Sequence, residues 1–182
     1  MKSFTQTLKY VLVITLMAGL SFQCEKKEED DNIELLALGA LLSGSGGCTV
    51  TAPPRASITT SVTEVTANGT ATISKIATVP FAGHQNAALK FTAKNGTDIE
   101  FQTGSNAFVI IYKSSACPLG SDNLVNSGFA TGMSTSTEFT GSYLLANNQQ
   151  ITFSTAGDYY VFFYAIPSRG QSASITYTMS GL

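Results

Sequence analysis

The chain has 182 residues, enough for one domain with its own core, and ten Lys and Arg against twelve Asp and Glu give a formal net charge of −2 at pH 7. No basic stripe is available to neutralise phosphates, which argues against a nucleic-acid partner. Charged residues make up only 12% of the chain, while Thr, Ser, Asn and Gly are abundant, and this mixture favours strands with hydroxylated outer faces over helices.

The N-terminal residues have the pattern of an export signal. Lys2 and Lys9 flank a polar start, and the apolar run YVLVITLMAGL follows over residues 10–20. A run of about eleven residues has the length of a signal-peptide core and is too short to span a bilayer. The sequence therefore predicts a signal peptide over residues 1–23 and no transmembrane helix in this segment.

The residues after this run are LSFQC, ending at Cys24, and a charged stretch over residues 25–31 follows directly. This order resembles a lipobox followed by a hydrophilic tether. Leu20 stands four residues before the cysteine and Gln23 directly before it, which departs from the common form, with Leu three residues before and a small residue adjacent. The sequence is more similar to the relaxed lipobox of spirochaetal lipoproteins.

The resemblance implies a diacylglyceryl thioether on the sulfur of Cys24 and a fatty acyl group, such as palmitate, on its amine. Together these chains bury enough methylene groups for stable membrane anchoring. The implied location is the cell envelope, anchored by lipid to the outer membrane, with periplasmic and surface display both open. The alternative is an ordinary signal cleaved near residues 19–21, which leaves a soluble protein with Cys24 unmodified.

A tether and one domain are expected after the signal. Residues 24–48 hold the lipidated cysteine, the charged stretch, a short apolar segment at 33–42 and a Gly/Ser linker. The folded domain is expected over residues 49–182. Its first strands are predicted at 57–65 and 71–79, where Thr, Val and Ile are frequent, with Asn68-Gly69 as a turn between them.

A β-hairpin is predicted around Asn95-Gly96. Apolar and polar residues alternate over 89–93 and again over 98–102. Asn-Gly between two alternating runs is the strongest short-range hairpin signal, because both central residues of a type I′ turn have positive φ. The sequence therefore predicts that these two runs pair with each other.

The rest of the domain also reads as strands and turns. The continuous apolar run FVIIY over residues 108–112 predicts a central strand covered on both faces. The segment 114–136 is a loop long enough to carry function or disorder. Further strands are predicted at residues 137–140, 143–146, 150–154, 159–166 and 173–179. With no convincing helix, the expected fold is an all-β antiparallel sandwich of jelly-roll or immunoglobulin-like type.

The closing residues carry a second resemblance. The stretches QITF at 150–153, AGDYYV at 156–161 and ASITYTM at 173–179 resemble the end of a prepeptidase C-terminal-type β-sandwich. The earlier pieces LKFT at 89–92 and VIIYK at 109–113 fall in the matching order. The resemblance implies a small accessory sandwich used for binding, secretion or stability and not a catalytic domain.

The titratable residues form no catalytic or metal-binding motif. His84 is the only histidine, so neither a zinc site nor a catalytic triad is indicated, and an exposed loop position is expected. Asp98 and Glu100 share one strand face, and we expect both side chains to face solvent there. Asp122 and Asn123, or Asp158, could offer oxygens to Ca²⁺, but turn capping is the favoured role. No enzyme activity, metal or cofactor is predicted.

Cys48 and Cys117 remain once Cys24 carries lipid. An even pair of cysteines in an oxidising compartment favours a disulfide, and two unpaired thiols are the alternative.

The aromatic strand at residues 159–164 places Tyr160, Phe162 and Tyr164 on one face and the other side chains on the opposite face. Burial of both faces is expected, with an exposed aromatic surface as the alternative.

Two functions are compatible with these patterns. The first is a lipid-anchored binding or adhesion module that contacts a protein or glycan through its Ser-, Thr- and Asn-rich loops. The second is a structural or accessory envelope lipoprotein without a ligand of its own. Exposed aromatic side chains near residues 114–136 would favour the first and a uniformly polar surface the second.

Overall fold

The computed structural model describes residues 47–51, 57–80 and 82–182, and all of them belong to one unit, Ser43–Leu182. The signal peptide, Cys24 and the charged stretch lie outside the described residues, and their roles stay predictions. The first described strand begins at Gly47, slightly before the expected domain boundary at residue 49.

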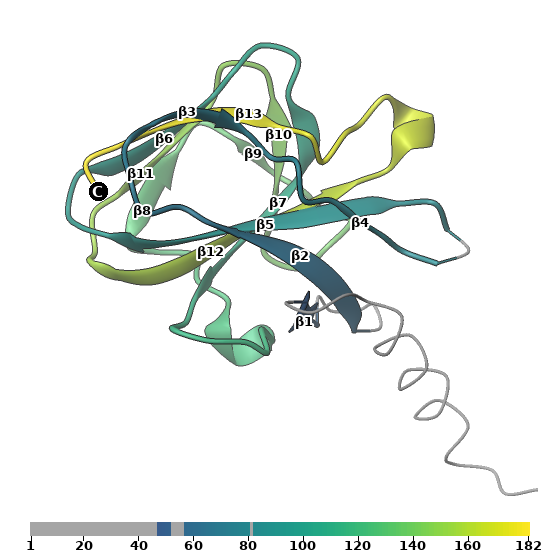
Figure 1. Cartoon of the computed structure of the whole chain (residues 1–182), viewed down its shortest axis with the longest axis horizontal. Coiled ribbons are helices and arrows are strands. Elements are labelled where there is room, and N and C mark those ends of the chain that lie inside the picture. The colour runs from purple at the N-terminus through teal and green to yellow at the C-terminus, as the bar shows by residue number, and fades with distance from the viewer. Residues whose placement is uncertain (1–46, 52–56, 81) are drawn as a thin grey trace, which may run out of the picture. The chain divides into compact units, whose positions relative to one another are not determined.

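Two β-sheets make up the described fold (Figure 1). The larger one has eight strands: β1 (Gly47–Val50), β2 (Ile58–Glu64), β4 (Ala77–Thr78), β5 (Gln85–Ala93), β7 (Asn106–Lys113), β9 (Ser134–Thr135), β10 (Ser142–Ala146) and β12 (Gly157–Ala165). The smaller one has five: β3 (Gly69–Thr72), β6 (Thr97–Phe101), β8 (Phe129–Thr131), β11 (Gln150–Phe153) and β13 (Thr176–Ser180).

The strand order is β1-β2-β5-β12-β7-β10-β9 in the larger sheet, with β4 also paired to β5, and β3-β13-β6-β11-β8 in the smaller sheet. All pairs are antiparallel except β2 with β5. The described residues contain no α-helix, only two short 3₁₀ turns, η2 (Ser121–Asn123) and η3 (Pro167–Arg169). The predicted all-β sandwich is therefore confirmed.

The predicted hairpin around Asn95-Gly96 is wrong. Consecutive strands mostly alternate between the two sheets, so β5 pairs with β12 whereas β6 pairs with β11 and β13. Gly96 has a positive φ of 88°, but Asn95 does not, and the Gly96 N–H donates to the Phe153 carbonyl oxygen (2.8 Å). The turn therefore crosses from one sheet to the other.

Other predicted strands are also corrected. The run 71–79 is split between β3 and β4, because the chain crosses between the sheets after Ile73, whose side chain is buried in the core. The run 137–140 is a turn, in which the Ser142 hydroxyl donates to the Phe139 carbonyl (2.8 Å). The last strand begins at Thr176, later than expected.

The main core lies between the sheets. Alternate residues of β5 and β12 point into it, and Ile99 and Phe101 of β6 meet them from the smaller sheet. Phe101 and Phe163 pack edge to face with ring centroids 5.7 Å apart. The alternation predicted for the aromatic strand places Tyr159, Val161 and Phe163 here, and all three are buried.

A second apolar cluster covers the outer face of the larger sheet. Tyr160 and Phe162 of β12 lie in it beside Phe108, Ile110 and Tyr112 of β7. The cover consists of Cys48, Val50, Leu119 and Phe139, with Leu124 packed beside them. Both faces of β7 and β12 are buried, as the sequence predicted, and the segment after β7 contributes to this cover.

Tyr112 carries a polar atom into this second cluster. Its side chain is buried, and its hydroxyl finds no hydrogen-bond partner among the described residues. An unsatisfied buried hydroxyl lowers stability, because its hydrogen bonds to water are lost on folding and not replaced. Tyr159, by contrast, donates its hydroxyl to the Thr155 carbonyl (3.0 Å).

We predict that Tyr112→Phe raises the free energy of unfolding by about 1 kcal/mol, because it removes the unpaired hydroxyl. Tyr159→Phe is the matched control, and it should lower that free energy by about 1 kcal/mol through loss of a hydrogen bond. Urea denaturation of the two variants measures both changes. A destabilised Tyr112→Phe protein would show that the hydroxyl has a partner.

Burial raises the pKa of the Tyr112 phenol from 10.0 to about 12. Between these two pH values the unfolded chain releases the proton while the folded chain keeps it, so stability falls as the pH rises. We predict that this group alone costs about 2 kcal/mol between pH 10 and pH 12. Denaturation of the wild type at pH 9 and 11.5 should show a larger loss than denaturation of Tyr112→Phe, and equal losses would contradict the assignment.

Candidate functional site

Cys48 and Cys117 form a disulfide, as predicted, with their Cα atoms 5.5 Å apart. Cys48 is buried in β1, whereas Cys117 is exposed in the segment after β7. Two backbone hydrogen bonds lie beside the bridge, from the Thr51 N–H to the Leu119 carbonyl (2.8 Å) and from the Leu119 N–H to the Thr49 carbonyl (2.9 Å). β1 is therefore held on one side by β2 and on the other by this segment.

We predict that the double variant Cys48→Ala/Cys117→Ala lowers the free energy of unfolding by about 4 kcal/mol, because the bridge joins residues 69 positions apart and restricts the unfolded chain. Ser115→Ala, at an exposed position in the same segment, is the control and should change little. Urea denaturation with and without a reductant measures the effect. A wild-type protein whose free energy of unfolding is the same with and without the reductant would refute the prediction.

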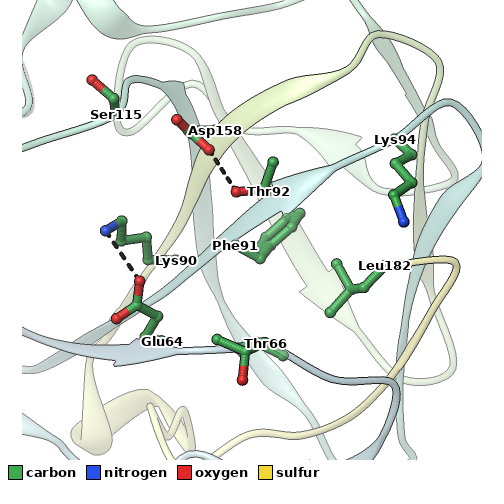
Figure 2. Close-up of a pocket in the computed structure, with 10 residues that line it drawn as sticks. Glu64, Thr66, Lys90, Phe91, Thr92, Lys94, Ser115, Asp158 and Leu182 are labelled. Atoms are coloured by element: carbon green, nitrogen blue, oxygen red, sulfur yellow. Dashed lines mark hydrogen bonds and ion pairs between the residues drawn. The ribbon is translucent and has the colours of Figure 1, made fainter.

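An open pocket of about 360 Å³ lies where β2 ends and β12 begins (Figure 2). Glu64 ends β2, Lys90 and Thr92 belong to β5, and Asp158 follows the turn into β12. The remaining lining residues are Val65, Thr66, Phe91, Lys94, Ser115 and Leu182. Two acidic and two basic side chains, Glu64, Asp158, Lys90 and Lys94, thus line a pocket at one end of the larger sheet.

Three of the four charged side chains that line the pocket have a hydrogen-bond or ion-pair partner within it. Lys90 Nζ donates to Glu64 Oε1 (3.2 Å), and Thr92 Oγ1 donates to Asp158 Oδ1 (2.6 Å). The hydrogen bond that Lys90 donates to Glu64 raises the pKa of Lys90, and the coulombic interaction with Tyr160 adds to this shift. The pair is solvent-exposed and therefore adds little to stability. The charged and hydroxyl groups of the pocket offer hydrogen-bond donors and acceptors to a polar ligand.

His84 lies outside this pocket, near the other end of the larger sheet. Its Nδ1 lies 2.6 Å from the Tyr164 hydroxyl, and the two rings meet edge to face. His84 is half-buried, so the expected exposed loop position is only partly correct. No serine or carboxylate hydrogen bond to its ring occurs within the described residues, and the geometry assembles no triad there.

The acidic residues singled out in the sequence lie apart from one another. Asp98 accepts a hydrogen bond from the Thr152 hydroxyl (2.6 Å), and Glu100 is exposed on the same face of β6. Asp122 lies in η2, where Asn123 Oδ1 accepts from the Gly120 N–H (3.0 Å). Among residues 47–51, 57–80 and 82–182, no group of three potential metal ligands occurs.

The outer face of the smaller sheet is a polar surface that the sequence reasoning missed. Two pairs of threonine hydroxyls bridge β3 and β13, Thr70 with Thr178 (2.9 Å) and Thr72 with Thr176 (2.7 Å). The face also carries Asp98, Glu100, Gln150, Thr152 and Ser180. The repeated Thr-x-Thr pattern at 70–72 and 176–178 was a signal for a hydroxyl-lined face, although the pairing of the two segments was not visible.

Comparison of the chain with protein families, with curated proteins and with solved structures gives no match. In the part of the chain that the structure describes, no helix has the length and apolar character needed to cross a bilayer. The function is therefore argued from the sequence and the geometry of this chain alone.

Proposed function

We propose that the protein is a lipid-anchored lipoprotein of the cell envelope that displays its β-sandwich as a binding or adhesion module. The observation that carries the proposal is the Cys48–Cys117 disulfide at the first strand of the domain. Disulfides persist in oxidising compartments outside the cytoplasm, which agrees with export directed by residues 1–23. Cys24, the third cysteine of the chain, is then left for lipid.

The proposed anchor is a lipid on Cys24 that holds the domain at the outer membrane. The charged stretch and the Gly/Ser linker give the tether its reach. The disulfide supports this arrangement because it fixes β1, where the tether joins the sandwich, to a segment that follows the central strand β7.

The proposed partner is a protein or a glycan. The pocket beside Glu64 and Lys90 and the threonine-lined face both offer hydrogen-bond donors and acceptors to a polar ligand. Nucleic acid is not the proposed ligand, because the sequence offers no basic stripe to neutralise phosphates.

A second candidate function is a structural or accessory lipoprotein without a ligand. One observation favours it: the only exposed large apolar side chain among the described residues is Leu144, at 37% exposure. Phe129 and Tyr143 pack edge to face and are half-buried, so no aromatic platform faces solvent in the segment 114–136. Binding by this protein would therefore depend on polar contacts.

We predict that Cys24→Ala moves the protein from the membrane fraction to the soluble fraction and that the mature N-terminus loses the mass of the acyl groups. Intact-mass analysis and fractionation measure both changes. Ser21→Ala is the control, because it alters the lipobox but keeps the cysteine, and it should stay membrane-bound. A Cys24→Ala protein that remained in the membrane fraction with unchanged mass would contradict the anchor.

The released Cys24→Ala protein also separates the two candidate functions. Saturable binding to isolated envelopes or to immobilised glycans, weakened by Glu64→Gln or Glu100→Gln, supports the binding module. Absence of saturable binding by the folded protein favours the accessory role.

A further inference from the structure

One edge of the smaller sheet is an open strand. β3 pairs with β13 through the register Thr72 with Thr176 and Thr70 with Thr178. The Ile73 N–H donates to the Ile175 carbonyl (2.9 Å), which fixes the alternation of hydrogen-bonded pairs along the strand. Ala71 and Gly69 therefore bond to β13, whereas the N–H and C=O groups of Thr70 and Thr72 point away from the sheet.

These outward groups face solvent in the described part of the chain. All four residues of β3 are exposed, and no hydrogen bond to the backbone of Thr70 or Thr72 occurs among the described residues from outside the sheet. The edge strand β1 of the larger sheet differs, because the backbone of Leu119 bonds to it on the side away from β2. Within residues 47–51, 57–80 and 82–182, the outer edge of β1 is therefore covered and that of β3 is not.

The composition of β3 does not protect its edge. Natural sheets usually block an open edge with a charged residue, a proline or a bulge. The sequence of β3 is Gly-Thr-Ala-Thr, which contains neither a charged residue nor a proline. Its register with β13 is continuous, so the strand has no bulge either. The N–H and C=O groups of Thr70 and Thr72 are thus available to pair with another strand.

We propose that β3 pairs antiparallel with β3 of a second copy of this chain, which joins the two five-stranded sheets across a two-fold axis at Ala71. In this register Thr70 faces Thr72 of the second copy, and the four outward groups of each strand bond to one another. The side chains of Thr70 and Thr72 meet their counterparts on the outer face. Cross-strand threonine pairs of this kind already join β3 to β13.

The charges near the edge permit this pairing. The register sets Lys75 opposite Ala67 of the second copy, so no two like charges face each other. Asp98 and Glu100 lie on β6, two strands in from the edge. Five strand spacings of about 4.8 Å separate β6 of one copy from β6 of the other, about 24 Å in all. This distance exceeds the Debye length of about 8 Å at physiological ionic strength, so their repulsion is screened.

A second copy fits this edge better than an unrelated peptide. Strand addition gains affinity from the backbone and specificity from pockets for alternate side chains. The pocket described above lies at β2, β5 and β12, and β3 contributes no residue to it. Self-pairing needs no such pocket, because symmetry supplies the complementary strand.

The proposed membrane anchor determines at what protein concentration the two copies pair, and this part of the inference rests on the proposed function. A four-residue strand gives a weak contact between molecules in dilute solution. Two copies tethered in one membrane meet at a much higher effective concentration. The anchored protein would therefore associate in the membrane, whereas the Cys24→Ala protein would associate only at high concentration.

Ala71→Cys provides the test, because residue 71 faces its own twin at a non-hydrogen-bonded position, where Cα atoms lie about 4.5 Å apart and a disulfide can form. We expect Ala71→Cys to cross-link between copies, in membranes and in concentrated Cys24→Ala protein, several-fold more than Ala130→Cys. Ala130 is exposed on β8, at the opposite edge of the same sheet. Non-reducing electrophoresis under mild oxidation measures the cross-link.

Two further variants isolate the backbone contact. Adding Thr72→Pro removes an outward N–H and the hydroxyl bond to Thr176 but no backbone bond to β13, and it should abolish the cross-link while the protein stays folded. Adding Thr72→Val removes the hydroxyl but keeps the N–H, and it should preserve the cross-link. Equal cross-linking of Ala71→Cys and Ala130→Cys, or cross-linking that survives Thr72→Pro, would overturn the proposal. Loss of the membrane anchor alone would leave the cross-link in concentrated solution intact.

Discussion

The bond between Cys48 and Cys117 holds in place the layer that covers the outer face of the larger sheet, and the burial of that face depends on this layer. Without it Tyr160 and Phe162 would face water beside the apolar side chains of β7. β1 alone is a weak cover, because it pairs with β2 over only four residues. The disulfide ties β1 to the segment after β7, so the two parts of the cover cannot separate independently.

The two sheets therefore meet solvent in different ways. The larger sheet is buried on both faces along β7 and β12, whereas the smaller sheet buries one face and leaves threonine, glutamine and two carboxylates on the other. The outer face of the larger sheet is largely apolar and covered, whereas the outer face of the smaller sheet is polar and open to contacts with other molecules. This division explains why a chain with few charges still has a polar surface.

The sequence predicted which residues are buried better than it predicted which strands pair. Continuous apolar residues at 108–112 and the aromatic alternation at 159–164 both describe burial, which is a local property of the chain. The hairpin predicted at Asn95-Gly96 was wrong because Phe91 and Ile99 point into the same core from opposite sheets, and this gives the same alternation of apolar and polar residues as two paired strands. The disulfide followed from counting cysteines, whereas the threonine pairs required the register of segments about a hundred residues apart.

Under the proposed anchoring, the position of the disulfide also determines which strands carry a pulling force that reaches the domain through its N-terminal tether. A pull through the tether reaches β1 first, at the edge of the larger sheet. Without the bridge, that force would act on the four pairs between β1 and β2 and on the two backbone hydrogen bonds to Leu119. Through Cys117 the force passes instead to the end of β7, which lies between β12 and β10 in the middle of the sheet. A module that holds a partner at a cell surface needs this path, because it loads many hydrogen bonds at once and leaves the edge strand in place.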